Sequence, residues 1–514
     1  MNYKILKLFC FTLIFGFLVL RCDSSKEMKN INLSELTISK IHSAYKEGLY
    51  TSEDLVSAYI NQIEKFDNNI NSISIINPEA LSIAKIMDEE YKNTSVLRPL
   101  HGIPLIVKDN INTKRLPTTG GSLALQDFIP EENAFIIDKL VNAGAIIIAK
   151  SNMAEWAFSA KHTESSTRGT TRNPYNPDYV PAGSSGGTAA SIASNFGVIG
   201  LGTDTGNSIR GPSSHNALVG FRTTIGLISR EGIIPLMLRN DVVGPMCRTV
   251  EDATRVMEVM VGYDPNDEIT KYSKDKIPDN YTQFLQKGGL KGARIGVLRE
   301  LIDDTSNKEI IALFENAIID LKILGAEVID SIEIQDFSNL KEDQWCAEFR
   351  KDLEAYLSKY VKQDSLKTLE DIIKIGSKSK YAQGRLEMFS SINGRFEHPE
   401  IECLDAYTDV KRIAFREAIQ DQMDILKLDA IIYPTWNNKP SKIDLFNEDY
   451  KGDNSQIIAP HTGQPAFTVP MGFNTGNLPV GIQFLGRMFD EATLIKLAYS
   501  YEQGTKHRVP PSIE

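Results

Sequence analysis

Cysteine and histidine are scarce in this chain, and their spacing excludes the common disulfide and metal motifs. Only five cysteines and seven histidines occur in 514 residues. Past the N-terminal segment, Cys247, Cys346 and Cys403 lie far apart without CxxC or CxxH spacing. The sequence leaves room for one disulfide, but neither a disulfide framework nor a zinc site is expected. The histidines form no HExxH or comparable pair, so the sequence predicts no metal site.

An excess of basic residues is also absent. Lys and Arg number 56 against 67 Asp and Glu, which gives a net charge of −11 at pH 7. Because proteins that bind nucleic acid rely on basic patches, we expect no nucleic-acid partner. Hydrophobic residues make up 42% and charged residues 24% of the chain, which excludes a disordered, collagen-like or coiled-coil protein. The length fits either two to four domains or one large α/β domain.

Only one long hydrophobic run occurs, and it lies at the N-terminus. Lys4 and Lys7 precede an apolar run of 13 residues at 8–20, interrupted only by a threonine and a glycine. The run is short for a membrane span and has the length of a signal-peptide core. We therefore predict a signal peptide at 1–22 and a polar linker at 23–31, with an uncleaved membrane anchor as the alternative. The prediction is of an exported protein that is periplasmic, secreted or lipid-anchored in a bacterium.

Cys22 ends this run, at the position where a bacterial lipoprotein carries its lipid. The sequence LVLRC at 18–22 resembles a lipobox, except that Arg21 replaces the small residue expected there. Lipidation of Cys22, with membrane attachment through the N-terminus, and ordinary cleavage nearby both remain open.

Short β-rich runs alternate with helical segments along the rest of the chain. Thr51 is predicted to cap a helix in which apolar residues recur at helical spacing. Other helices are expected at 133–142 and 308–324. The runs expected as strands are 103–107, 145–149, 198–201, 295–298, 327–329 and 430–433. Such alternation predicts an α/β fold with a largely buried sheet. The charged segment 335–400 is predicted to be helical, as an inserted cap or a solvated layer.

Residues 181–226 are unusually rich in glycine and in hydroxyl side chains. From Gly183 to Gly211 there are eight glycines, eight serines or threonines and one cation, Arg210. This composition indicates tightly turned backbone with free N–H groups, which suits a nucleophile and an oxyanion hole. GSSGG at 183–187 also fits the G-x-S-x-G elbow of Ser-His-Asp hydrolases, with Ser185 as nucleophile. That elbow needs a buried strand before it, whereas polar, turn-rich residues precede this one.

Several motifs in this order resemble the amidase signature family. They are GIPLIVKDN at 102–110, TTGGS at 118–122, GSSGG at 183–187, GTDTGNSIR at 202–210, GQPA at 463–466 and LPVGIQF at 478–484. The resemblance covers residues 32–508 and implies one large amidase domain at 32–514. It implies a mixed central β-sheet covered by helices, and no cofactor. Motifs at both ends of the chain favour one domain over several small ones.

The resemblance implies a Ser–Ser–Lys triad made of Lys108, Ser184 and Ser208. Ser208 would be the nucleophile, Ser184 the bridging serine held by a cis peptide bond, and Lys108 the base. A lysine accepts a proton only when neutral, so burial must lower its pKa by several units from about 10.4. The apolar run that ends at Lys108 offers such burial. Taken singly, the three residues also fit a solvated strand-end lysine, a turn serine and a helix cap.

The family pattern further implies an oxyanion hole. Its backbone N–H donors would come from Thr205, Gly206, Asn207 and Ser208. Asn207 stands where the family usually has glycine; asparagine tolerates left-handed backbone, but its side chain would narrow the acyl or leaving-group side. Ser185 would orient Ser184, and Asp204 and Arg210 would brace the loop as an ion pair.

The function implied is that of an exported amidase. It would hydrolyse a carboxamide of a small molecule or peptide through an acyl-enzyme on Ser208, releasing ammonia or an amine. A glutaminase-like subunit of an aminoacyl-tRNA amidotransferase is the alternative, disfavoured by the export signal and the acidic charge. A non-catalytic surface lipoprotein is disfavoured because the full triad is present. Residues 335–400 and 434–460 are predicted to line the substrate pocket, whose acyl group the sequence does not identify.

Overall fold

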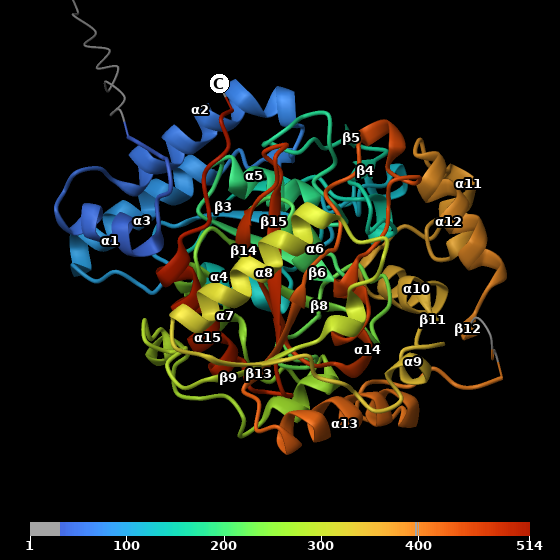
Figure 1. The fold of residues 1–514 in the computed structure, drawn as a ribbon. Helices are drawn as coiled ribbons and strands as arrows, with labels where there is room; N and C mark the ends of the chain where they lie inside the picture. The colour runs from blue at the N-terminus through green and yellow to red at the C-terminus, as the bar shows by residue number, and fades with distance from the viewer. Residues whose placement is uncertain (1–30, 396–397, 399, 514) are drawn as a thin grey trace, which may run out of the picture.

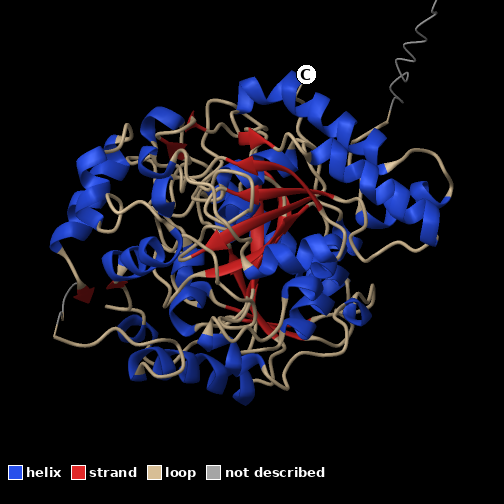
Figure 2. Ribbon diagram, turned by 180° about the vertical axis from the view of Figure 1, so that it is seen from behind, coloured by secondary structure: helices blue, strands red, loops and turns tan. Residues whose placement is uncertain are grey.

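The computed structural model describes residues 31–395, 398 and 400–513, and its centre is one sheet of eleven strands (Figures 1 and 2). The strand order is β1-β3-β2-β6-β8-β7-β14-β15-β13-β9-β10. The bounds are β1 Ile73–Ile76, β2 Pro104–Lys108, β3 Ile146–Ser151, β6 Ile199–Asp204, β7 Val219–Arg222, β8 Val242–Cys247, β9 Arg294–Val297, β10 Glu327–Asp330, β13 Ala430–Pro434, β14 Ala466–Phe473 and β15 Pro479–Leu485. Parallel and antiparallel pairs both occur, so the predicted mixed sheet is confirmed.

Helices cover both faces of this sheet (Figure 2). They are α1 Ile38–Lys46, α2 Ser52–Ile70, α3 Ala80–Thr94, α4 Phe135–Asn142, α5 Gly186–Ala193, α6 Arg210–Ser214, α7 Val250–Met260, α8 Lys308–Ile323, α9 Phe337–Leu340, α10 Phe349–Tyr360, α11 Leu369–Ile375, α12 Lys380–Ser391, α13 Val410–Ile425, α14 Ala459–Thr462 and α15 Glu491–Thr505. All six predicted strands and the three predicted helices are present. Thr51 caps α2 through a full capping box with Asp54.

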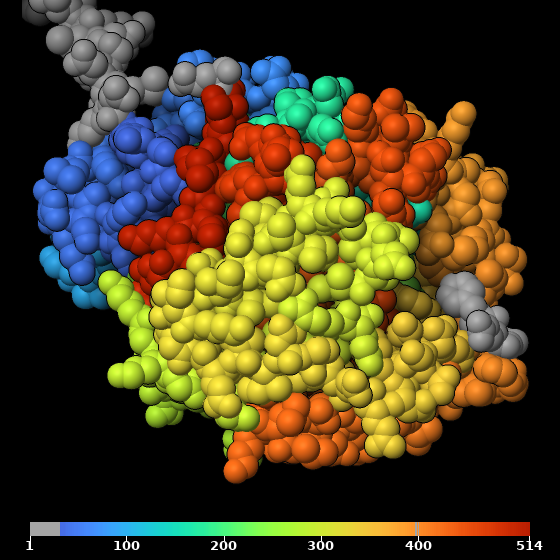
Figure 3. Space-filling view, in the orientation of Figure 1, coloured from blue at the N-terminus to red at the C-terminus, as the bar shows by residue number. Residues whose placement is uncertain are grey.

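The chain folds as one domain because its two ends share the same sheet and surface. The sheet takes strands from residue 73 to residue 485. Arg508 near the C-terminus pairs with Glu35 at 2.8 Å, and Figure 3 shows the C-terminal segment (red) against the N-terminal helices (blue). The length alone would have allowed several domains, but one continuous sheet of eleven strands joins the chain into a single domain.

The segment 337–395 forms a helical cap at one side of the sheet, where Figure 1 shows α10, α11 and α12 together. Its apolar side chains form a separate core with Trp156 and Phe158. Two short ladders complete the described strands, β4 Glu164–Ser165 with β5 Gly169–Thr170, and β11 Cys346–Ala347 with β12 Gly394–Arg395. Cys346 and Cys403 form a disulfide, which settles the question the sequence left open. The buried core of the described part of 335–400 favours the cap over a solvated layer.

Some predictions concern residues that are not described. The signal peptide at 1–22, Cys22 and the linker up to residue 30 lie outside the described residues. Within the described part of the chain, no helix has both the length and the apolar character needed to cross a membrane.

Candidate active site

Lys108 lies at the carboxyl end of β2 and is completely buried. Its Nζ is 2.7 Å from Ser184 Oγ, 2.8 Å from Thr203 Oγ1 and 3.4 Å from the Thr203 carbonyl oxygen. Burial lowers the pKa of Lys108 to about 7, although the charges of Asp204 and Asp241 oppose the shift. A substantial fraction of this amine is therefore neutral at pH 7. The burial excludes the solvated strand-end alternative.

The neighbours of Lys108 fix the direction of its lone pair. A neutral lysine amine has two N–H donors and one acceptor site. The hydroxyl and carbonyl oxygens of Thr203 lie in position to receive the two donors, and Asn110 Nδ2 holds the same Thr203 hydroxyl at 3.1 Å. In the neutral state the remaining lone pair faces the Ser184 hydroxyl. Lys108 is thus arranged to accept a proton from Ser184.

Ser184 reaches Lys108 because the backbone before α5 passes through a very narrow gap. The Gly183–Ser184 peptide bond is cis. A Cβ atom at Gly183 would lie 2.3 Å from the His162 carbonyl oxygen and 2.4 Å from that of Ser159, so only glycine fits there. Ser185 Oγ is 3.2 Å from the Thr203 carbonyl oxygen, and it therefore ties this segment to the end of β6.

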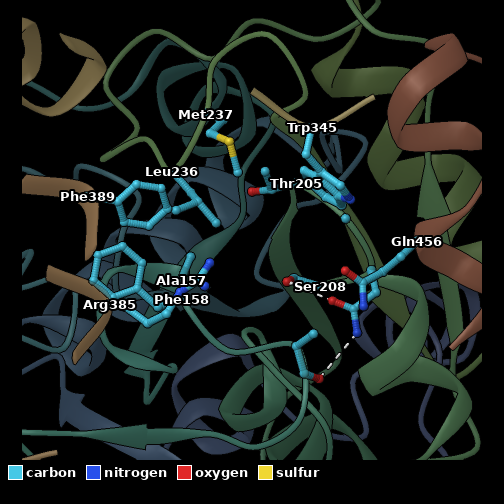
Figure 4. A pocket seen from close by; sticks show the side chains of 13 residues that line it. Ala157, Phe158, Thr205, Ser208, Leu236, Met237, Trp345, Arg385, Phe389 and Gln456 are labelled. Carbon is cyan, nitrogen blue, oxygen red and sulfur yellow. Dashed lines mark hydrogen bonds between the residues drawn. The ribbon is translucent and has the colours of Figure 1, made fainter. Parts of the chain in front are cut away.

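Ser208 lies in the turn that connects β6 to α6. Its Oγ donates to Asn207 Oδ1 at 3.3 Å, and Asn207 Nδ2 donates to the Ala160 carbonyl at 3.3 Å (dashed lines in Figure 4). Among the described residues, no hydrogen bond joins the hydroxyls of Ser184 and Ser208. The structure thus brings Lys108 and Ser184 into contact and holds the Ser208 hydroxyl on Asn207.

The turn at 205–208 also carries backbone N–H groups without acceptors in the described part of the chain. The N–H groups concerned are those of Thr205, Gly206, Asn207 and Ser208, and none of them donates to another described residue. Free N–H groups that converge beside a hydroxyl can stabilise an oxyanion. Asn207 is not among the described residues with positive φ, so the tolerance of asparagine for left-handed backbone is not needed at this position. Asparagine fits here because an ordinary backbone conformation suffices.

A buried ion network holds the turn in place. Asp204 accepts from Arg210 Nε at 3.1 Å and from Arg222 Nη1 at 2.8 Å. Burial alone would raise the pKa of Asp204, but the two guanidinium groups outweigh it and hold that pKa at about 2. Arg210 also donates to the Gly206 carbonyl at 2.7 Å. The carboxylate therefore stays charged, and Arg210 connects it to the turn.

Several residues of the site were not predicted from sequence. Thr203 and Asn110 lie inside the family motifs, yet the contacts of Thr203 with Lys108 and with Asn110 depend on the pairing of β2 with β6. Arg222 comes from β7, and no local pattern places it beside Asp204. Asp241 accepts from Thr205 Oγ1 at 2.5 Å and also from two backbone N–H groups at 236–237. These contacts are long-range, so sequence spacing does not reveal them.

A pocket with about 740 Å³ of free space, part of it open to solvent, lies beside Ser208 (Figure 4). It is lined by Ala157, Phe158, Ala160, Thr205, Gly206, Asn207, Ser208, Leu236, Met237, Trp345, Arg385, Phe389 and Gln456. Trp345, Arg385 and Phe389 come from 335–400, and Gln456 comes from 434–460, so both segments line the pocket as predicted. Among the residues the structure describes, no cluster of His, Cys, Asp or Glu could hold a metal ion.

Comparisons with known proteins agree with this geometry. The family model described as Amidase matches residues 54–495. A probable amidase of Arabidopsis thaliana is 34% identical over 516 residues, covering 96% of this chain and 95% of the relative. One subunit of the glutamyl-tRNA(Gln) amidotransferase of Thermoanaerobacter pseudethanolicus is 33% identical and covers 94% of this chain and 99% of its own. The X-ray structure of a native peptide amidase from Stenotrophomonas maltophilia superposes with a TM-score of 0.83 at 32% identity, covering 94% of this chain and 99% of that chain.

Proposed function

The chain belongs to the amidase family, and we propose that its substrates are peptides that end in a carboxamide. It is an amidohydrolase that cleaves the C–N bond of a linear amide, giving a carboxylate and ammonia or an amine. Two observations support peptide amides: the likeness to a peptide amidase, and a roomy pocket beside Ser208 whose aromatic and aliphatic side chains suit a peptide.

The proposed proton relay runs from Ser208 through Ser184 to Lys108. Neutral Lys108 takes the proton of Ser184, Ser184 takes that of Ser208, and Ser208 Oγ attacks the amide carbon. The 2.7 Å contact between Lys108 and Ser184 carries this proposal. In this relay the Ser208 hydroxyl leaves Asn207 Oδ1 and donates to Ser184 before the attack.

The free N–H groups of the turn 205–208 would hold the oxyanion that forms on the carbonyl oxygen. Collapse of the tetrahedral intermediate breaks the C–N bond, and the relay returns the proton to the departing nitrogen. Water then attacks the acyl ester on Ser208. The same relay takes the proton of that water and returns one to Ser208 Oγ, which restores the enzyme.

Replacement of the proposed nucleophile tests this function. Ser208→Ala is expected to abolish both ammonia release from peptide amides and labelling by a fluorophosphonate. Ser191→Ala is the matched control, because Ser191 is a buried serine on α5 whose hydroxyl only donates to the Thr188 carbonyl. Hydrolysis and labelling that survive in Ser208→Ala would refute the assignment.

A glutaminase-like component of an amidotransferase is a second candidate, favoured by the 33% identity to such a protein. It predicts ammonia release from glutamine that depends on partner proteins and on charged tRNA. The net charge of −11 disfavours binding of tRNA. Robust hydrolysis of peptide amides by the purified chain alone would exclude this candidate.

We also propose that the protein is exported. The apolar run at 8–20 supports this, and so does the Cys346–Cys403 disulfide, because disulfides persist mainly in oxidising compartments. Fractionation of cells that express the full chain should place it outside the cytoplasm. A change in gel mobility on Cys22→Ser would indicate a lipid on Cys22, whereas unchanged mobility would indicate ordinary cleavage.

A further inference from the structure

One wall of the pocket combines apolar side chains with a single cation. Figure 4 shows Phe158, Leu236, Phe389 and Arg385 on the side opposite Trp345 and Gln456. Arg385 belongs to α12 of the helical cap and is the one charged side chain in the described lining of the pocket. A guanidinium group at this place faces whatever occupies the space next to Ser208.

Arg385 differs from the other arginines in its lack of acceptors. Every other arginine in the described part of the chain donates to a carboxylate, amide or carbonyl oxygen, for example Arg350 to Glu370 and Arg412 to the His461 carbonyl. The contact recorded for Arg385 is from Nη1 to the Met388 sulfur at 3.4 Å. Its Nε is buried and has no partner among the described residues. Since a thioether is a weak acceptor, most of the five N–H donors of the Arg385 guanidinium remain unused.

The guanidinium is nevertheless held in a defined orientation. Its central carbon lies 5.1 Å from the centre of the Phe389 ring, a cation–π arrangement. Phe389 in turn packs on Phe158 at 5.4 Å and on Phe349 at 5.2 Å. A guanidinium held over an aromatic ring can still direct its Nη donors at a ligand, and such donors match the oxygens of a carboxylate.

The surrounding charges favour an anion at this wall. Lys161 lies close enough for the charge of Arg385 to lower its pKa, together with burial, which is the larger cause. Lys161 Nζ donates to Asn447 Oδ1 at 2.9 Å, and Glu448 acts on it in the opposite direction. The carboxylate of Asp453, next to Gln456 in the sequence, accepts hydrogen bonds from the Ser455 hydroxyl and from Gln456 Nε2. Neither cation therefore has a carboxylate partner within salt-bridge distance among the described residues.

We infer that Arg385 is a specificity-determining residue that binds a carboxylate on the acyl part of the substrate. The inference rests on the proposed function, because release of ammonia leaves only the acyl part to occupy the pocket. A peptide amide with a glutamate side chain near the scissile amide fits: its methylene groups would contact Phe158 and Leu236, and its carboxylate would take the free edge of Arg385. The neutral glutamine analogue would leave the guanidinium unpaired.

The test compares two peptide amides that differ only by glutamate or glutamine. The wild type is expected to show a kcat/KM for the glutamate peptide at least about tenfold above that for the glutamine peptide. This ratio corresponds to about 1.4 kcal/mol, which a hydrogen bond between charged groups can supply. In Arg385→Met, which keeps the packing on Phe389, the ratio should approach one. Lys380→Met is the matched control, because Lys380 begins the same helix and is exposed.

Two further measurements separate the possible failures. Arg385→Glu should prefer a lysine peptide over the glutamate peptide, which a merely misfolded variant would not do. Fluorophosphonate labelling of Ser208 and hydrolysis of the glutamine peptide should persist in Arg385→Met. A ratio near one in the wild type, or an unchanged ratio in Arg385→Met, would overturn the inference while leaving the proposed amidase intact. Absence of hydrolysis for every peptide amide would instead refute the proposed function.

Discussion

The pH dependence of hydrolysis is expected to follow one buried amine, that of Lys108. Burial lowers its pKa from 10.5 to about 7. At the ordinary pKa only about one molecule in 3,000 would hold a neutral amine at pH 7, whereas at a pKa near 7 about half do. Below pH 6, kcat/KM should therefore fall about tenfold for each pH unit, and above pH 8 it should be level. Asp204, whose pKa is about 2, stays charged throughout this range.

The assay is ammonia release from a neutral peptide amide between pH 5 and 9.5, together with the rate of fluorophosphonate labelling. Both should share one midpoint near pH 7. Asp352, which accepts from the Leu238 N–H at 2.8 Å, also has a pKa raised by burial to about 7, so Asp352→Asn is the control and should leave the midpoint unchanged. A midpoint near 10, or a flat profile below pH 7, would refute the role of Lys108.

The lowered pKa of Lys108 should also make the free energy of unfolding increase with pH. Between pH 7 and 10.5 the folded state binds fewer protons at Lys108 than the unfolded state, so stability rises with pH across this window. Below pH 7 the folded state carries the full cost of the buried charge, about 5 kcal/mol. Lys108→Met removes this cost. Its melting temperature relative to the wild type should be higher at pH 6 than at pH 10, and the opposite order would contradict the depressed pKa.

Three other substitutions have defined outcomes. Asn207→Gly removes the oxygen that competes for the Ser208 hydroxyl, so kcat/KM should rise about fivefold, given about 1 kcal/mol for a hydrogen bond; slower fluorophosphonate labelling would contradict this. Thr203→Val removes one acceptor of Lys108, so the plateau of the pH profile should fall about tenfold and its midpoint should move to lower pH, because the charged amine loses more than the neutral one. Cys403→Ser opens a disulfide that spans 57 positions and should lower the free energy of unfolding by about 4 kcal/mol in denaturant titrations. Reducing agent should act likewise on the wild type and leave Cys403→Ser unchanged.

Local patterns predicted the parts of the fold that local residues determine. The apolar runs gave β2, β3, β6, β9, β10 and β13, and Thr51 marked the start of α2. The antiparallel strands β14 and β15 overlap two family motifs but are not predicted as strands, because their pairing with β7 and β13 is long-range. The disulfide could not be assigned either, since the spacing of three cysteines does not indicate which two meet.

The candidate site shows the same division. The motif order predicts that Lys108, Ser184 and Ser208 share one site. The direction of the Lys108 lone pair, however, depends on Thr203, which contacts Lys108 only because β2 and β6 run parallel and end at the same edge of the sheet. Whether Asn207 needs the left-handed backbone that asparagine tolerates depends on the turn in this chain, and the turn leaves this residue outside the positive-φ region. Arg385 lies on an ordinary amphipathic helix, and nothing in its sequence neighbourhood indicates that it lacks a partner.

The apolar run that precedes Lys108 determines both a strand of the sheet and the pKa of the proposed base. The same residues that form β2 bury the amine, and burial is the largest cause of its lowered pKa. A more polar strand would admit water, raise that pKa and leave the amine protonated at neutral pH. The strand next to it supplies Thr203 to hold the two N–H donors. The base is therefore a property of two paired strands, and a substitution that admits water to either strand should impair catalysis by shifting the pH midpoint upward before it unfolds the protein.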